Sequence, residues 1–102
     1  MILGDSTMYN VTVTRKSEKE LLIIVHGEDH AIGNMIVKEA LKHPNVTYAA
    51  YRIPHPLQDR LEIYLSLKEG FDPVAVFKEV CSNIRRYLLE FRKEVEEKII
   101  ET

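Results

Sequence analysis

The C-terminal third of the chain has the periodicity of one helix that is longer than a domain of this size is wide. Asp72 and Pro73 predict its start, because aspartate is a favourable N-cap and proline is tolerated at the first helical position. A helix over residues 73–99 would be about 40 Å long at 1.5 Å per residue. A compact domain of about 100 residues has a diameter of about 33 Å. Such a helix must extend past the rest of its own domain.

Apolar side chains recur at helical spacing along one face of this predicted helix, while charged side chains fill the opposite face. The apolar stripe consists of Phe77, Val80, Cys81, Ile84, Tyr87, Leu88, Phe91, Val95 and Ile99. Since the stripe continues past the expected edge of the domain, we expect a second chain to cover it. The alternative is that the last two turns fray or fold back.

The rest of the chain contains strand patterns and one further helical pattern. Alternating apolar and polar residues predict half-buried strands, and apolar residues at i, i+3 and i+4 predict a helix. The expected strands cover residues 9–13, 21–26, 46–53 and 61–67, and the first helix covers residues 29–42. We therefore expect an α+β fold in the order β-β-α-β-β-α, with two layers and a four-stranded, mainly antiparallel sheet. Residues 1–102 should form a single domain, with residues 1–8 as a loose leader.

Residues 27–34 mark the start of the first helix. Asp29 is the predicted N-cap, because its carboxylate can accept the free backbone N–H groups of the first turn. Gly33 lies inside the helix, where glycine costs about 1 kcal/mol relative to alanine. Either another backbone comes close to Gly33 or the glycine is there by chance, and the pattern alone leaves both interpretations open.

The charge balance and the length of the apolar runs exclude several classes of protein. The formal net charge is −2 and the isoelectric point is about 6.1, which provide no basic field for a phosphate backbone or an anionic membrane surface. No apolar run reaches the ~20 residues that a transmembrane helix needs, and the N-terminus has no signal-peptide core. Cys81 is the only cysteine, so an internal disulfide is excluded and a reducing intracellular compartment is expected.

No set of residues predicts catalysis or a cofactor. The histidines at positions 26, 30, 43 and 55 do not have the spacing of a metal site. Glu28 and Asp29 are adjacent carboxylates, but their place before a helix favours capping over acid–base chemistry. Cys81 lies on the apolar stripe and is interpreted as a small core residue. The residues alone predict a small α+β module that associates with another protein.

Three segments together resemble one known family. They are GEDHAIGN at residues 27–34, PNV at residues 44–46 and YRIPHPL at residues 51–57, and the likeness extends over residues 9–99. The chain is similar to subunit L of archaeal RNA polymerase and to its small eukaryotic counterparts, a family that shares an assembly motif with the bacterial alpha subunit. It departs from the family at Ala31 and Ile32, where threonine and leucine are usual, which removes a hydroxyl but keeps the apolar anchor.

The resemblance implies a non-catalytic subunit without a cofactor that forms a heterodimer with a larger alpha-like subunit, called D in archaea. The heterodimer would be the platform on which the two large catalytic subunits assemble for DNA-templated transcription. The compartment would be the cytoplasm in an archaeon and the nucleus in a eukaryote. No direct contact with nucleic acid or with a membrane is expected.

The resemblance and the apolar patterns together assign two surfaces. The first helix would cross the equivalent helix of the partner, with Gly33 permitting close approach, and the second helix would supply the rest of the interface. The partner interface would comprise Asp29, His30, Ile32, Gly33, Asn34, Ile36, Phe77, Val80, Ile84, Tyr87, Leu88, Phe91 and Val95. The stiff turn formed by Pro54, His55, Pro56 and Leu57 would dock a large subunit.

Two other functions remain open at this point. The chain could be a free-standing homodimer that binds RNA or another protein through its sheet, where Tyr48, Tyr51 and Tyr64 lie on predicted strands. The element order differs from that of the common RNA-binding sheet, and basic residues are not interleaved with these tyrosines, so core or interface packing is favoured. A small enzyme that uses residues 28–29 and His30 is the least favoured function.

Overall fold

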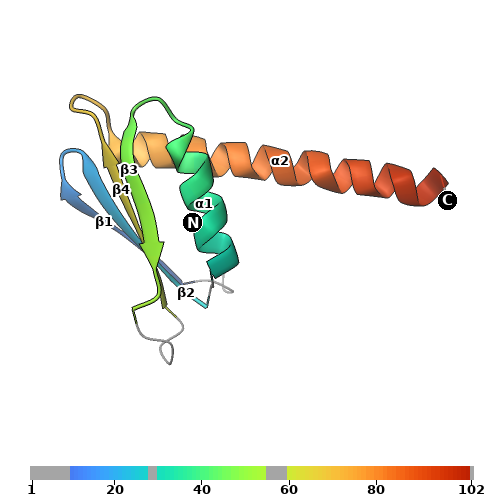
Figure 1. Ribbon diagram of the computed structural model, residues 1–102, viewed down its shortest axis with the longest axis horizontal. Helices are drawn as coiled ribbons and strands as arrows, with labels where there is room; N and C mark the ends of the chain where they lie inside the picture. Colours follow the sequence, from blue (N-terminus) through green and yellow to red (C-terminus); the bar gives the residue numbers. More distant parts are fainter. Residues whose placement is uncertain (1–9, 28–29, 55–59, 102) are drawn as a thin grey trace.

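The computed structural model describes residues 10–27, 30–54 and 60–101 and confirms the predicted order β-β-α-β-β-α (Figure 1). The strands are β1 (Asn10–Ser17), β2 (Glu20–His26), β3 (Val46–Arg52) and β4 (Arg60–Leu67). The helices are α1 (His30–Leu41) and α2 (Pro73–Glu101). The predicted leader at residues 1–8 and the predicted N-cap Asp29 lie outside the described residues.

The four strands form one antiparallel sheet in the order β1-β2-β4-β3. β2 and β4 lie in the centre, where Leu21 pairs with Leu65 and Ile23 with Ile63. Side chains directly opposite each other in an antiparallel pair lie on the same side of the sheet. The alternating apolar residues of the two central strands thus form one continuous apolar face, as their sequences predict.

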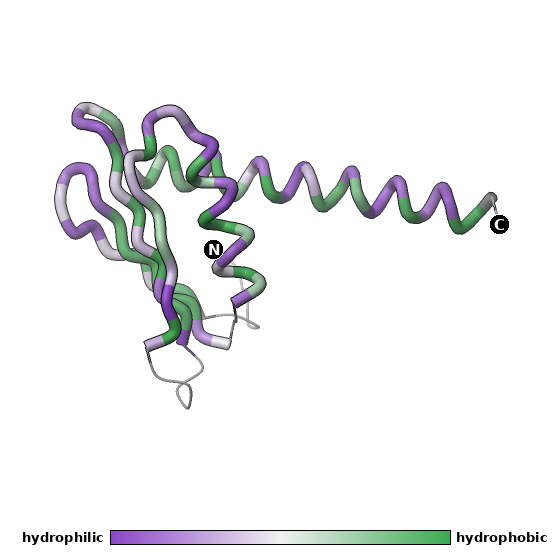
Figure 2. Tube along the Cα trace, in the orientation of Figure 1, coloured by the Kyte–Doolittle hydropathy of each residue, from purple (hydrophilic) through white to green (hydrophobic). Residues whose placement is uncertain are grey.

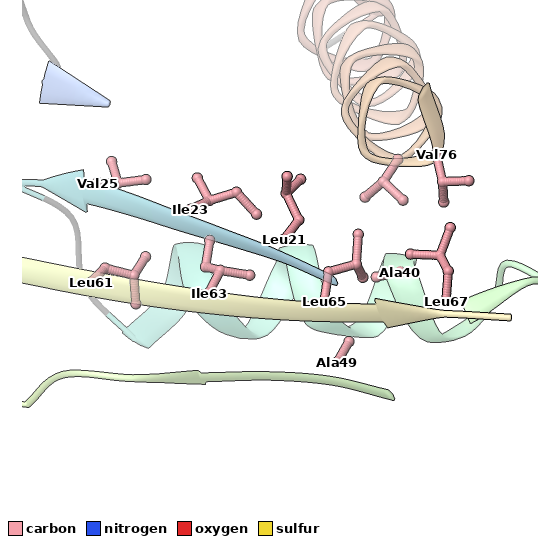
Figure 3. Packing of buried hydrophobic residues seen from close by; sticks show 11 residues of the cluster. Leu21, Ile23, Val25, Ala40, Ala49, Leu61, Ile63, Leu65, Leu67 and Val76 are labelled. Carbon is pink, nitrogen blue, oxygen red and sulfur yellow. The ribbon is translucent and has the colours of Figure 1, made fainter. Parts of the chain in front are cut away.

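Both helices cover this apolar face of the sheet (Figure 1). α1 packs along β3 and β4, and the first turns of α2 pack on β2 and β4 and against α1. The structure is therefore two-layered, and Figure 3 shows the buried side chains between the layers. The core consists of Leu21, Ile23, Val25, Ala40, Ala49, Leu61, Ile63, Leu65, Leu67, Val76 and Val80.

The edge strand β1 is less buried than a half-buried strand would be. Val11 and Val13 pair with Val25 and Ile23, so their side chains lie on the helix side of the sheet. About half of each side chain is nevertheless exposed. The reason is that the helices pack on β2, β4 and β3, which leaves β1 beyond their reach.

A bulge in β3 changes which of its side chains share a face. Strict alternation would place Val46 on the same face as Tyr48. In the structure Val46 pairs with Leu67 and Tyr48 pairs with Ser66, so that Thr47 is an extra residue between the two pairs. Val46 consequently packs against the core, while Tyr48 lies on the opposite face of the sheet and is exposed.

α2 extends far beyond the sheet, which confirms the prediction of a helix longer than its domain is wide (Figure 1). It contains 29 residues, and the principal axes of the structure measure 51 × 35 × 28 Å. Figure 2 shows that apolar residues recur along the whole projecting part of the helix. Within the described ranges, no helix is both long and apolar enough to cross a membrane.

Candidate partner-binding surface

The apolar stripe of α2 divides into a buried part and an exposed part. Val76 and Val80 are almost completely buried, at 3% and 1% exposure, and belong to the core against the sheet. Ile84 is half-buried and packs against the same core. From Tyr87 onward the stripe is exposed, and Phe91 reaches 68% exposure. A continuous apolar surface therefore begins where α2 leaves the sheet.

This division corrects part of the predicted interface. Val80 was assigned to the partner surface, but it is fully buried in the core of its own chain. Phe77 and Ile84 are half-buried against the same core, because the first turns of α2 pack on β2 and β4. The predicted α2 residues that stay exposed are Tyr87, Leu88, Phe91 and Val95.

On α2, sequence reasoning missed two exposed apolar residues, Leu89 and Ile100. At about 100° per residue, both side chains point roughly 130–150° away from the centre of the stripe. This angle could have predicted that they are exposed outside the stripe. Cys81, interpreted as a core residue, is also exposed. Partial desolvation raises the pKa of its thiol and keeps it in the protonated, poorly nucleophilic form.

The exposed stripe begins beside a groove between α1 and α2. The groove has a volume of about 250 Å³ and is lined by Met35, Lys38, Glu39, Lys42, Ile84, Tyr87 and Leu88. Two cations lie near the Tyr87 ring, with Lys42 Nζ at 5.5 Å and the Arg86 guanidinium at 5.4 Å from its centroid. Both distances permit cation–π attraction, which favours a fixed position of the ring. The groove and the stripe form one apolar path from α1 to the end of α2.

Gly33 faces the sheet of its own chain. A Cβ added there would lie 2.6 Å from Cγ and Cδ2 of Tyr51 and 3.0 Å from Cδ1 of Leu61. The group that comes close is the side-chain ring of Tyr51 in β3 of the same chain, and not another backbone as one of the two sequence interpretations expected. The structure thus corrects the assignment of Gly33 to a crossing with a partner helix, because the Tyr51 ring occupies that space.

The other predicted residues of α1 differ in how much they offer a partner. Ile32 and Ile36 pack against the core, so only part of each side chain reaches the surface. His30 is exposed, and its Nδ1 lies 3.4 Å from the Tyr51 hydroxyl. Asn34 is exposed, which leaves it available for a second chain.

The predicted docking turn for a large subunit lies mostly outside the described residues. Pro54, its first residue, is exposed just after the end of β3. His55, Pro56 and Leu57 fall in the gap between residues 54 and 60. Their role therefore stays a prediction.

The sheet face opposite the helices carries Tyr48 and Tyr64, whose ring centroids are 5.8 Å apart. The Tyr64 hydroxyl donates a hydrogen bond to the Glu20 carboxylate, which lowers the pKa of Glu20 and raises the pKa of Tyr64. Arg52 donates to Glu62 over 2.8 Å on the same face. An arginine already held by a carboxylate contributes less to a phosphate-binding surface, so this face gives little support to RNA binding.

The described histidines lie apart from one another. His43 Nε2 lies 3.2 Å from a carboxylate oxygen of Glu79, while His30 contacts Tyr51. In the part of the chain that the structure describes, no group of three or more histidine, cysteine or acidic side chains could hold a metal ion. The arrangement that stands out chemically is the exposed apolar path, which suits it to binding another chain.

Comparison with known proteins identifies relatives of the chain. The family model for the RNA polymerase Rpb3/Rpb11 dimerisation domain matches residues 20–94. A probable DNA-directed RNA polymerase II subunit RPB11 of Plasmodium falciparum is 34% identical over 88 residues, which cover 86% of this chain and 68% of that protein. The DNA-directed RNA polymerase subunit Rpo11 of Aeropyrum pernix is 31% identical over 83 residues, which cover 81% of this chain and 80% of that protein.

The fold is similar to that of a solved structure, the crystal structure of DNA-directed RNA polymerase subunit L from Thermoplasma acidophilum. The TM-score is 0.75 at 22% sequence identity, and the match covers 90% of each chain. The family match extends along α2 to residue 94 and so includes Tyr87, Leu88 and Phe91 of the exposed stripe.

Proposed function

Because the chain belongs to the Rpb3/Rpb11 dimerisation-domain family of RNA polymerase subunits, we propose that it forms a heterodimer with a larger alpha-like subunit, called D in archaea. The observation that carries the proposal is the exposed apolar stripe on the projecting part of α2. Contiguous apolar surface of this kind marks a site for another protein, since its burial removes it from water.

The exposed stripe can contribute enough free energy for a stable pair. Fully burying a Val, Ile or Phe side chain contributes roughly 1.5–3 kcal/mol. Phe91 and Ile99 are each about two-thirds exposed, and Val95 lies between them on the same face. Several such side chains together offset a substantial part of the entropy lost on association. The groove beside Met35 extends the surface, so that the partner would contact both helices.

The proposed interface combines the exposed stripe with the accessible part of α1. Tyr87 and its neighbours in the groove would form the centre, where two helices of one chain meet the partner. Val80 and Gly33 are excluded because their own chain covers them. The proposed contact residues are Asp29, His30, Ile32, Asn34, Ile36, Tyr87, Leu88, Phe91 and Val95, with Phe77 and Ile84 at the edge.

The heterodimer would be a non-catalytic platform for the two large catalytic subunits, and residues 1–102 would be its small dimerisation domain. The names of the relatives described above, which are DNA-directed RNA polymerase subunits, support this role. The turn that begins at Pro54 would dock a large subunit. β3 runs away from the end of the sheet where α2 starts, so this turn follows the strand end that is remote from the stripe (Figure 1). The compartment would be the cytoplasm in an archaeon and the nucleus in a eukaryote.

Co-expression with the alpha-like subunit of the same organism tests the proposal. Size exclusion with mass measurement should find a one-to-one complex. Phe91→Asp should abolish the complex, because a carboxylate would replace an apolar contact. Leu89→Asp is the matched control, since Leu89 is exposed on the same helix but points away from the stripe.

Two results would contradict the proposal. One is a chain that stays apart from the alpha-like subunit while it binds RNA or another protein as a homodimer. The other is a heterodimer that tolerates Phe91→Asp as well as Leu89→Asp, which would place the interface elsewhere.

A further inference from the structure

The projecting segment of α2, defined as residues 85–101, has opposite charges at its two ends. Residues 85–93 carry four basic side chains and one acidic side chain, which are Arg85, Arg86, Arg92, Lys93 and Glu90. Residues 94–101 carry four acidic side chains and one basic side chain, which are Glu94, Glu96, Glu97, Glu101 and Lys98. Residues 85–100 are all exposed. The sign of the charge changes at the middle of the projecting segment.

The apolar stripe of the same segment is nearly symmetric about Lys93. Tyr87 and Ile99 lie six residues to either side of it, and Phe91 and Val95 lie two residues to either side. Residue 93 is also the midpoint of the projecting segment. A second copy of α2 laid antiparallel over the full segment would bring Phe91 opposite Val95 and Tyr87 opposite Ile99.

We propose that the chain forms a homodimer when its alpha-like partner is absent, through antiparallel overlap of the projecting segments of two copies. The inference rests on the proposed function, because the homodimer would cover the stripe that the heterodimer uses. An antiparallel overlap places the basic end of each segment beside the acidic end of the other, whereas a parallel overlap places like charges together. At about 100° per residue, Arg85, Arg92, Glu94 and Glu96 lie beside the stripe, whereas Arg86, Lys93 and Glu97 point away from it. Packed helices are about 8–10 Å apart, close to one Debye length at physiological salt, so the charges beside the stripe act across the interface, where they compete with the Arg92–Glu96 ion pair of 3.2 Å within each helix.

At one position of the overlap, an apolar side chain of one copy would face a charged side chain of the other. Leu88 would lie opposite Lys98, whose alkyl stem can cover an apolar neighbour while its ammonium group stays in water. The other stripe residues of the segment, Tyr87, Phe91, Val95 and Ile99, meet apolar residues of the second copy, as a two-fold interface requires, because the same surface of each copy meets its counterpart.

The overlap also agrees with the shape of the chain. α2 leaves the two-layered domain on one side, so two antiparallel copies carry their domains at opposite ends of the helix pair (Figure 1). The homodimer and the heterodimer would exclude each other, since both cover Phe91 and Val95. Chain made in excess of the alpha-like subunit would thus be held as a pair until that subunit displaces one copy.

Sedimentation of the chain alone tests the pairing and its direction. The wild-type chain should be a dimer at micromolar concentration. Arg85→Glu with Arg92→Glu, or Glu94→Lys with Glu96→Lys, should weaken self-association about tenfold or more, because like charges then meet beside the stripe. An equimolar mixture of the two variants, and a chain with all four substitutions, should regain the affinity to within about threefold. Circular dichroism should show similar helix content in every variant.

Two results would overturn the inference. The first is a wild-type chain that stays monomeric well above micromolar concentration. The second is a pair of charge-reversed variants that each self-associate as tightly as wild type while their mixture associates more tightly than wild type, which would indicate parallel helices. Failure of the alpha-like subunit to bind would count against the proposed function alone, because self-association is measured without that subunit.

Discussion

The inner and outer halves of α2 have the same apolar periodicity, but the apolar face is buried in the inner half and exposed in the outer half. In the inner half, residues 73–84, Val76 and Val80 are buried against the sheet. In the outer half, residues 85–101, an equally regular stripe is exposed. Spacing determines which residues share one face of a helix, but the extent of the sheet determines how far its own chain covers that face. Periodicity therefore predicts a face that will be buried without predicting which chain buries it.

The largest difference between the halves should come from placing a carboxylate in each. Val80→Asp should unfold the domain, because an unpaired buried charge costs several kcal/mol out of a total stability of about 5–15 kcal/mol. Phe91→Asp should change the free energy of unfolding of the monomeric domain, measured below the concentration at which the chain self-associates, by no more than about 0.5 kcal/mol and still abolish the heterodimer. Thermal unfolding and co-purification measure the two effects. Equal destabilisation by both substitutions would show that the outer half of α2 is as important for folding as the inner half.

Removing the end of the outer half should weaken association and spare the domain. A stop after Arg92 deletes Val95 and Ile99, and burying such a side chain contributes roughly 1.5–3 kcal/mol. The dissociation constant of the heterodimer should rise about 100-fold or more, at 1.4 kcal/mol per factor of ten. Circular dichroism should lose only the signal of the deleted residues. An unchanged dissociation constant would show that no partner reaches the end of α2.

α1 repeats the contrast between a covered side and an accessible side. Gly33→Ala should destabilise the chain by about 1–3 kcal/mol, because the new Cβ overlaps the Tyr51 ring. If Gly33 lay on an open helix surface, Gly33→Ala would instead stabilise the chain by about 1 kcal/mol. Asn34→Ala, at an exposed neighbour, is the control and should change the free energy of unfolding little. Combining Gly33→Ala with Tyr51→Ala should give a non-additive cycle, and additive losses would contradict the contact.

The smallest effect concerns the start of the inner half. Arg15 pairs with Asp72 over 2.7 Å, and Asp72 also accepts the N–H of Val74 as the N-cap of α2. The Arg15 guanidinium lowers the pKa of Asp72 below its ordinary value of 3.8. The folded state thus favours the carboxylate, and its contribution to stability is present above pH 3.8 and is lost as the pH falls below that value.

Thermal melts of wild type and Asp72→Asn measure this contribution. The difference in melting temperature should be small, because both side chains are about half exposed, and it should shrink further below pH 3.8 and at high salt. A difference that stays constant through this range would show that the charge of Asp72 does not matter for the cap.

Local patterns were sufficient to predict the order of the elements, the antiparallel sheet and the apolar stripe, although β1 continues to Ser17, beyond its predicted end at residue 13. The alternation of Leu61, Ile63, Leu65 and Leu67 indicated a central strand with one core face, and the structure confirms it. The comparisons confirm the family resemblance that was inferred from residues 27–34, 44–46 and 51–57. These features depend on residues that are close in the sequence.

The features that sequence reasoning missed depend on two segments meeting in space. The bulge at Thr47 arises from the register between β3 and β4, which a single strand does not specify. The partner of Gly33 is Tyr51, which belongs to a different element, so the glycine indicated a close approach without indicating its direction. Val80 was assigned to the interface because the stripe itself contains no sign of where the sheet ends.

Because α2 is one uninterrupted helix, it fixes both the distance and the rotation angle between the sheet and the outer stripe. Each residue advances the helix by about 1.5 Å and turns it by about 100°. One residue inserted after Ile84 would swing the outer stripe by about 100° and point it away from any chain docked against α1. Seven inserted residues would turn it by roughly two full rotations, restoring the direction but moving the surface outward by about 10 Å. The number of residues between Val80 and Phe91 therefore determines the angle at which a second chain on the outer stripe is held relative to the sheet.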